Sequence, residues 1–179
     1  RAILHLLSSN EYSLHALGPI IECLSLCEQL HIYSIKGPAL SVLGRLFLEM
    51  NEPHLSLSTL RAALPALLKG DHVWFQGHAF LNMAKCHLSL VKQVSSGSKK
   101  ESKLKRGVCT ALKYLKRAKS ILGTCHDAKG LREIYYLQAR LYASMPSFDE
   151  LARNQAAQNF VAISRHMAKQ SCTTGGVMQ

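Results

Sequence analysis

The chain has 179 residues, 47% of them hydrophobic, and a formal net charge of +11. This length suits one domain or a short repeat array, and the apolar content excludes a disordered chain. No run of 18 apolar residues occurs, so the sequence predicts no membrane-spanning helix. Because the chain opens at Arg1 in the middle of an apolar pattern, we interpret it as a fragment whose N-terminal repeats are missing.

Helical periodicity runs from about Ser13 to Lys169, and strand signals are absent. Turn signals interrupt the periodicity at residues 36–38, 51–53, 69–71, 94–107, 123–127 and 144–147. Between them the pattern predicts helices of roughly 15 to 20 residues, a length that suits packed helix pairs.

Two kinds of helix alternate along the chain. The first kind carries a large residue, then a large residue beside a small one, then a ring, which is typical of the first helix of a tetratricopeptide repeat. Its copies are Leu40, Leu43-Gly44 and Phe47; Phe80, Met83-Ala84 and His87; and Tyr135, Gln138-Ala139 and Tyr142. The second kind runs small, large, small, with copies Ala16, Ile20 and Cys23; Ser56, Leu60 and Ala63; Ala111, Leu115 and Ala118; and, more loosely, Ala156, Phe160 and Ile163.

The spacing between the two kinds of helix is constant. The distance from the first small marker of a second helix to the small marker of the next first helix is 28 residues in all three copies. A fixed interval indicates a fixed packing unit, as stacked repeats require. We expect six positions to carry this packing: Gly44, Ala84, Ala111, Ala118, Ala139 and Tyr142.

The pattern therefore predicts an all-α fold, a tetratricopeptide-like α-solenoid of antiparallel helix pairs in a right-handed superhelix. The predicted domain covers residues 1–179, with first repeats at 13–68, a repeat with a basic loop insertion (92–107) at 71–122, a last repeat at 127–169 and a disordered tail at 170–179. A generic Leu/Ala-rich bundle stays open as an alternative, because it also places apolar residues at i, i+3 and i+4.

A cation follows the small marker of each predicted first helix. These residues are Arg45, Lys85 and Arg140. First helices line the concave groove of tetratricopeptide arrays, so we expect a basic ladder there, with His78 and Tyr136 nearby. Such a groove would attract carboxylates, which Arg can bind bidentately. Alternatively, the cations cover apolar neighbours or pair with local acids such as Glu49 and Glu133.

Signatures of catalysis, metal binding or phosphate binding are missing, so we predict a non-enzyme without cofactors. Neither G-x-x-x-x-G-K-[ST] nor H-E-x-x-H occurs, and the pairs Cys86-His87 and Cys125-His126 lack partners at ligand spacing. The six cysteines include no C-x-x-C pair, which favours free thiols. The basic stretch 92–107 offers serines for phosphorylation but no interleaved aromatic residue to stack bases.

Three segments carry a resemblance to a known family. They are FLNMAKCHLSL at 80–90, ALKYLKRAKSIL at 111–122 and YYLQARLYASM at 135–145. In this order they resemble the C-terminal tetratricopeptide region of the subunit 5 family of the anaphase-promoting complex, over about residues 13–169. The Ser/Lys-rich loop and the tail after Gln170 depart from that family.

The resemblance implies a non-catalytic scaffold of a nuclear and cytoplasmic ubiquitin ligase that drives mitotic exit, with platform subunits 1, 4 and 15 as partners. It implies no small-molecule substrate and no membrane association. A free-standing peptide-binding repeat adaptor, such as a co-chaperone or cargo adaptor, stays open, and an RNA-binding repeat protein is a weaker alternative.

Overall fold

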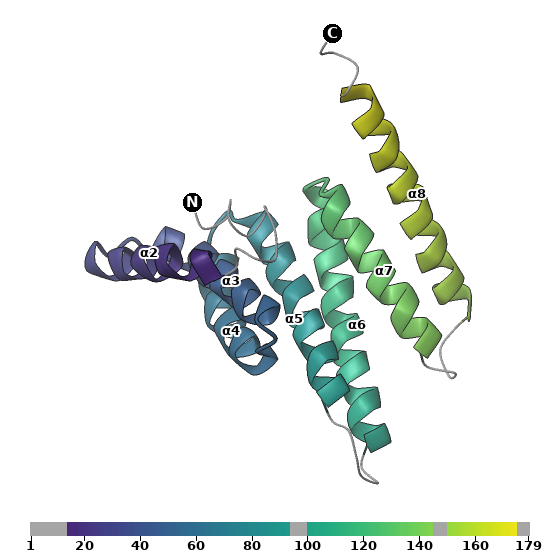
Figure 1. Cartoon of the computed structure of the whole chain (residues 1–179), viewed down its shortest axis with the longest axis horizontal. Coiled ribbons are helices and arrows are strands. Elements are labelled where there is room, and N and C mark those ends of the chain that lie inside the picture. The colour runs from purple at the N-terminus through teal and green to yellow at the C-terminus, as the bar shows by residue number, and fades with distance from the viewer. Residues whose placement is uncertain (1–13, 94–99, 145–149, 175–179) are drawn as a thin grey trace. The chain divides into compact units, whose positions relative to one another are not determined.

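The computed structural model describes residues 14–93, 100–144 and 150–174, and every regular element in these ranges is a helix (Figure 1). A short 3₁₀ helix, η2 (Leu14–Ala16), leads into seven α-helices. These are α2 (Leu17–Gln29), α3 (Tyr33–Glu49), α4 (Pro53–Lys69), α5 (Val73–Gln93), α6 (Lys100–Thr124), α7 (Ala128–Ser144) and α8 (Glu150–Thr174). The all-α prediction is confirmed. Among the described helices we find no candidate for a membrane-spanning segment.

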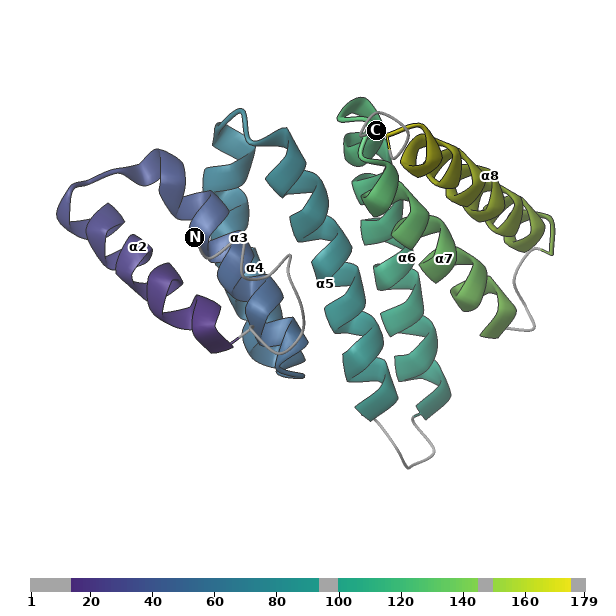
Figure 2. The ribbon, with the colours of Figure 1, turned by 45° about the horizontal axis from the view of Figure 1, so that its top comes forward.

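The chain divides into two compact units, Arg1–Ile121 and Leu122–Gln179, with the boundary inside α6. Within the first unit, α3 contacts α2, α4 and α5, and α4 also contacts α5 (Figure 2). Within the second, α7 contacts α8. Helices thus pack on their neighbours in the sequence, which is consistent with the stacked pairs of an α-solenoid.

The backbones of α3 and α4 approach each other closely. A Cβ atom built on Gly44 would lie 2.6 Å from Cγ of Leu60, so a residue without a side chain is needed here. The Ser56 hydroxyl donates a hydrogen bond of 2.6 Å to the carbonyl of Gly44. Near the other ends of the two helices, a Cβ on Gly37 would lie 3.1 Å from Ala66. Positions thus rise along α3 as they fall along α4, which makes the pair antiparallel.

Ser56 also connects this pair to the next helix. The Cys86 thiol of α5 donates a hydrogen bond of 3.0 Å to the Ser56 hydroxyl, and both side chains are fully buried. The hydroxyl can donate to one helix and accept from another, so both buried polar groups have partners. The bonds therefore join α3, α4 and α5 at one level of the stack.

Aromatic contacts hold α6 against α5. The Tyr114 ring stacks on Phe80 at 6.1 Å and on His87 at 5.6 Å between centroids. The guanidinium of Arg117 lies 4.8 Å from the centroid of the Phe80 ring. Leu115 is fully buried on the same helix. Because Phe80 and His87 are two turns apart on one face of α5, Tyr114 covers the space between them.

The second unit has fewer buried apolar side chains among its described residues. Leu122 and Ile134 are fully buried, Leu141 is 7% exposed and Ala156 is 5% exposed. The rings of Tyr136 on α7 and Phe160 on α8 lie 5.8 Å apart. Few buried apolar side chains therefore hold α7 and α8 together among the described residues.

Three of the turns share one geometry. His31 after α2, Asn51 after α3 and His126 after α6 each have a positive φ, between 53° and 61°. The N–H of the next residue then bonds to a carbonyl five positions earlier, as in Ile32 to Cys27 at 2.9 Å. This is the Schellman arrangement, which closes a helix through a left-handed residue.

The expected turn at residues 36–38 is wrong, because Pro38 lies inside α3. Proline has no N–H, so it cannot bond the carbonyl four residues earlier, that of Ser34. His72 Nε2 lies 2.9 Å from this carbonyl, and because a carbonyl only accepts, the ring nitrogen donates. The chain turns instead at residues 30–32.

Two further predicted boundaries need correction. Most of the expected loop at residues 92–107 is helical, since α5 continues to Gln93 and α6 begins at Lys100. Lysine and glutamate favour helix, so a charged composition alone does not indicate a loop. Residues 170–174 of the expected disordered tail continue α8, while residues 94–99 and 175–179 lie outside the described part of the chain.

Candidate partner-binding surface

The six residues predicted to carry helix packing differ in burial. Gly44, Ala84, Ala111 and Ala118 are buried in the first unit. Ala139 and Tyr142 of the second unit are half-buried. The packing role of these last two stays a prediction.

Arg45 lies one position beyond the close approach at Gly44 and is half-buried. Its Nε donates to Oε1 of Glu49 at 2.9 Å, one turn further along α3. This is the local acid partner that the sequence offered as an alternative to ligand binding. The bond to Glu49 uses the Nε–H group of the guanidinium. Its terminal N–H groups can still donate to a carboxylate.

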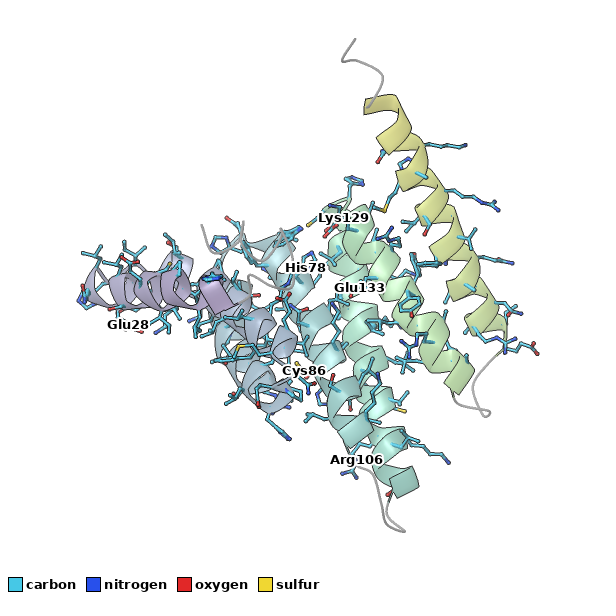
Figure 3. The ribbon with its side chains drawn as sticks, viewed as in Figure 1. Glu28, His78, Cys86, Arg106, Lys129 and Glu133 are labelled. Atoms are coloured by element: carbon cyan, nitrogen blue, oxygen red, sulfur yellow. The ribbon has the colours of Figure 1, made fainter. Side chains whose placement is uncertain are left out.

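The predicted residues of α5 share one side of that helix. His78 and Lys85 are seven positions apart, which brings them to the same face two turns from one another. The His78 ring lies 4.0 Å from the ring of Trp74, whose side chain is 39% exposed. Figure 3 shows His78 on the upper half of α5. This face therefore combines an exposed aromatic, an imidazole and a lysine.

The predicted residues of α7 contact each other directly. The Arg140 guanidinium lies 5.6 Å from the centroid of the Tyr136 ring and donates to its hydroxyl at 3.4 Å. The Phe160 ring of α8 also packs against the Tyr136 ring. Stacking on an aromatic face restricts a long side chain and leaves its planar edge accessible. The pair is therefore arranged to receive an anionic group.

The five ladder residues are divided between the two units. Arg45, His78 and Lys85 belong to the first, and Tyr136 and Arg140 belong to the second. In the structure, Arg140 contacts Tyr136 directly. His78 and Lys85 lie on the same face of α5. A continuous ladder across all five residues stays a prediction.

Trp74 and Phe160 contact candidate site residues, although the sequence analysis did not select them for the site. Trp74 precedes His78 by four positions, the spacing that places two side chains side by side on a helix. That spacing is a signal that the sequence contains. Phe160 was selected only as a packing marker, and its contact with Tyr136 depends on the register of α8 against α7, which no local pattern gives.

The neighbouring residues Cys86 and His87 are not activated as a catalytic pair. Burial raises the pKa of the Cys86 thiol, so at neutral pH it stays protonated and is a poor nucleophile. Burial and the charge of Arg61 lower the pKa of His87, whose Nε2 is buried and has no hydrogen-bond partner within the described chain. Across the described ranges, no three His, Cys, Asp or Glu side chains lie together as a metal site requires.

A cavity of about 440 Å³ lies in the second unit between α7 and α8. Its lining is mainly apolar, with His126 and His166 as the polar groups besides Gln170. Two histidines are fewer than the three ligands that a metal site needs, and no larger metal-binding group lies among the described residues. The cavity fits a role in packing or binding.

Comparison with known proteins gives one distant similarity. No family model matches the chain. The chain is 25% identical over 145 residues to anaphase-promoting complex subunit 5 from Homo sapiens and to the same subunit from Pongo abelii. The match covers 81% of this chain but 18% of each relative. It supports a distant relationship between this helical region and part of that subunit.

Proposed function

We propose that the chain is part of a non-catalytic scaffold subunit of an anaphase-promoting-complex type ubiquitin ligase, which controls the mitotic cell cycle in nucleus and cytoplasm. The observation that carries this proposal is the similarity to subunit 5 across most of the chain. The helical pairs support it, because stacked helices offer extended surfaces for other proteins.

The proposed site is the set of first-helix faces, on α3, α5 and α7. The Arg45–Glu49 and Arg140–Tyr136 contacts hold guanidinium groups at the surface with reduced rotamer freedom. Such preorganised cations bind a carboxylate at a smaller entropic cost than free side chains do. Acidic segments of neighbouring subunits, by resemblance platform subunits 1, 4 and 15, are the proposed ligands.

The decisive experiment is affinity purification of the tagged full-length protein from cells of its own organism, followed by mass spectrometry. A scaffold subunit is recovered in stoichiometric amounts with the other subunits of the ligase. Recovery as a monomer with chaperones, or with cargo at substoichiometric levels, would support the free-standing peptide-binding adaptor instead.

The first-helix site has its own test. We expect the double variant Arg45→Glu with Arg140→Glu to lose incorporation into the assembly, because carboxylates would then face the acidic ligands. The matched control is Lys69→Glu with Arg165→Glu, which makes the same charge change at exposed positions of α4 and α8. Co-purification is measured at equal expression and after a check that both variants melt normally. Normal incorporation of a folded Arg45/Arg140 variant would show that partners bind elsewhere.

A further inference from the structure

The positive charge of the chain is concentrated in one region. Between residues 72 and 126 lie eleven of the 22 Lys and Arg but one of the eleven Asp and Glu. The rest of the sequence is nearly balanced in charge. The net charge of +11 is therefore a property of the α5–α6 region and not of the whole surface.

Most of these cations lie on the outer side of α6. The buried residues described on α6 are Val108, Ala111, Leu115, Ala118 and Leu122. The opposite side carries six exposed cations, which we name the α6 basic face: Lys105, Arg106, Lys113, Lys116, Arg117 and Lys119. Figure 3 labels Arg106 near the first turns of the helix.

The cations of this face form rows along the helix. Arg106, Lys113 and Arg117 follow the spacing i, i+7, i+11, which keeps them on one strip of the surface. The strip extends about 16 Å, at a rise of ~1.5 Å per residue. Lys105 and Lys116 form a second strip beside it. Short exposed side chains, Ser102, Cys109 and Ser120, lie between the strips.

Three cations of this face have no acidic partner among the side chains that the structure describes. Arg106, Lys113 and Lys116 form no ion pair with any residue whose side chain the structure describes. Lys113 lies three positions before Lys116 and four before Arg117, where like charges repel and destabilise a helix. Solvated surfaces that serve solubility usually mix acids with bases, whereas no acid stands among these bases from Lys105 to Lys119. The repulsion is relieved when an anionic partner covers the face.

We infer that the α6 basic face is a docking surface for an acidic protein segment, either helical or extended. Its cations require carboxylates, and the short side chains between the strips let the backbone of a bound segment approach. Nucleic acid is the less suitable partner, because no exposed aromatic side chain stands among these cations to stack bases. Tyr114, the aromatic residue of the helix, is half-buried and stacked on Phe80 and His87. The surface consists of other residues than the first-helix site and does not depend on the proposed function.

The test measures binding of labelled probes to the 179-residue chain by fluorescence anisotropy. The probes are an Ala-based helical peptide of roughly 20 residues with Glu at i, i+4 spacing, long enough to follow the face, a single-stranded RNA and a DNA duplex of similar charge. We expect the peptide to bind and its affinity to fall steeply as salt increases. The variant Arg106→Glu, Lys113→Glu and Lys116→Glu should lower this affinity by about tenfold or more.

The matched control reverses three exposed cations of the second unit, in Lys129→Glu, Arg132→Glu and Arg165→Glu. It has the same net charge as the α6 variant and should change the peptide affinity by less than about twofold. Arg117 is left intact in both variants because it covers Phe80. The α6 variant should melt at the same or a higher temperature, since it removes like-charge repulsion.

Cys109 provides a measure of where the peptide binds, because it is exposed in the middle of the face. Bound peptide should slow alkylation of Cys109 by iodoacetamide, while alkylation of Cys125 continues at its former rate. Equal losses in the two variants, equal protection of the two thiols, absence of peptide binding, or tighter binding of RNA or DNA at the same face would each overturn the inference.

Discussion

At the scale of single residues, Gly44 shows how little space separates two helices of this fold. Leu60 is fully buried opposite it, so its side chain has no room to move away. The Ser56–Gly44 hydrogen bond fixes the same contact from the side of α4. A methyl group added at position 44 would therefore push α3 and α4 apart.

We expect Gly44→Ala to destabilise the fold by about 1–3 kcal/mol, the usual cost of overpacking. For a chain of this size each kcal/mol lowers the melting temperature by about 2–4 °C. Gly18→Ala is the control, since an added Cβ there meets nothing within 4 Å, and it should leave the melting temperature unchanged or raise it. Equal melting temperatures of the two variants would contradict the close approach.

His87 makes stability depend on pH. Its pKa lies below the ordinary value of 6.5 in the folded protein because burial, and secondarily Arg61, disfavour the charged ring. The unfolded chain therefore takes up a proton at a higher pH than the folded chain does. The free energy of unfolding should thus be unaffected by His87 above about pH 6.5 and should fall as pH decreases through this value and toward the folded-state pKa.

His87→Phe keeps a ring against Tyr114 and removes the proton site. We expect its free energy of unfolding to fall less than that of the wild type as pH decreases from about 7.5 to 5.5. The wild type loses stability over this range because its buried ring stays neutral while the histidine of the unfolded chain takes up a proton. Urea denaturation at both pH values measures the difference. His54→Gln, a change at an exposed histidine, should keep the wild-type dependence. An unchanged dependence in His87→Phe would show that His87 titrates normally.

At the scale of elements, one side chain compensates for a proline inside a helix. Pro38 leaves the Ser34 carbonyl of α3 without its helical donor, and His72, in the turn before α5, donates to it. Gln76 adds a similar link, donating to the Leu67 carbonyl at 2.8 Å. Side chains just before and within the first turn of α5 thus bind the backbone of two earlier helices.

This compensation can be measured with a double-mutant cycle. His72→Ala should cost about 0.5–1.5 kcal/mol, the net value of a typical hydrogen bond. In a Pro38→Ala background the restored N–H satisfies the carbonyl, so the same change should cost less. Chemical denaturation of the four proteins gives the coupling free energy. A coupling of zero would mean that His72 does not replace the missing donor.

The sequence predicted the helices well where its signals were local. The small markers, the 28-residue interval and the turns at 51–53, 69–71 and 123–127 anticipated helix pairs that the structure contains. The turn at 36–38 was wrong because the donor that lets Pro38 stay in α3 comes from His72, 34 residues away. The actual turn has a histidine, His31, in the left-handed position where a glycine or asparagine is the usual signal.

The candidate site was predictable in part. The spacing placed His78 and Lys85 on one face of α5, and it offered Glu49 as a partner for Arg45. The spacing could not predict contacts between helices, because these depend on the register in which one helix packs along the next. The outer face of α6 was missed for another reason. Its first cations were assigned to a loop, and only a continuous helix brings Arg106 into line with Lys113 and Arg117.

At the scale of the whole molecule, the two units differ in how much apolar surface they bury. The first unit contains most of the buried apolar residues among those described, including Leu46, Leu60 and Phe80. Along the described length of α8, by contrast, Ala156 is the one buried apolar residue, and Leu151 is 74% exposed. Burial of apolar surface is the main stabilising term in folding, so the energy that resists local opening is unequal along the chain.

We therefore expect α8 to open separately from the helices of the first unit. In native-state hydrogen exchange followed by mass spectrometry, amides of α8 should exchange at least about 100-fold faster than amides of α4 and α5, because local opening of a sparsely buried helix costs less than global unfolding. Amides of α7 should fall between them, since Ile134 and Leu141 are buried there. Adding denaturant at low concentration should accelerate exchange in α4 and α5 while α8, which already opens locally, changes little. The same protection in all four helices would contradict this expectation and show that the chain unfolds as one cooperative unit.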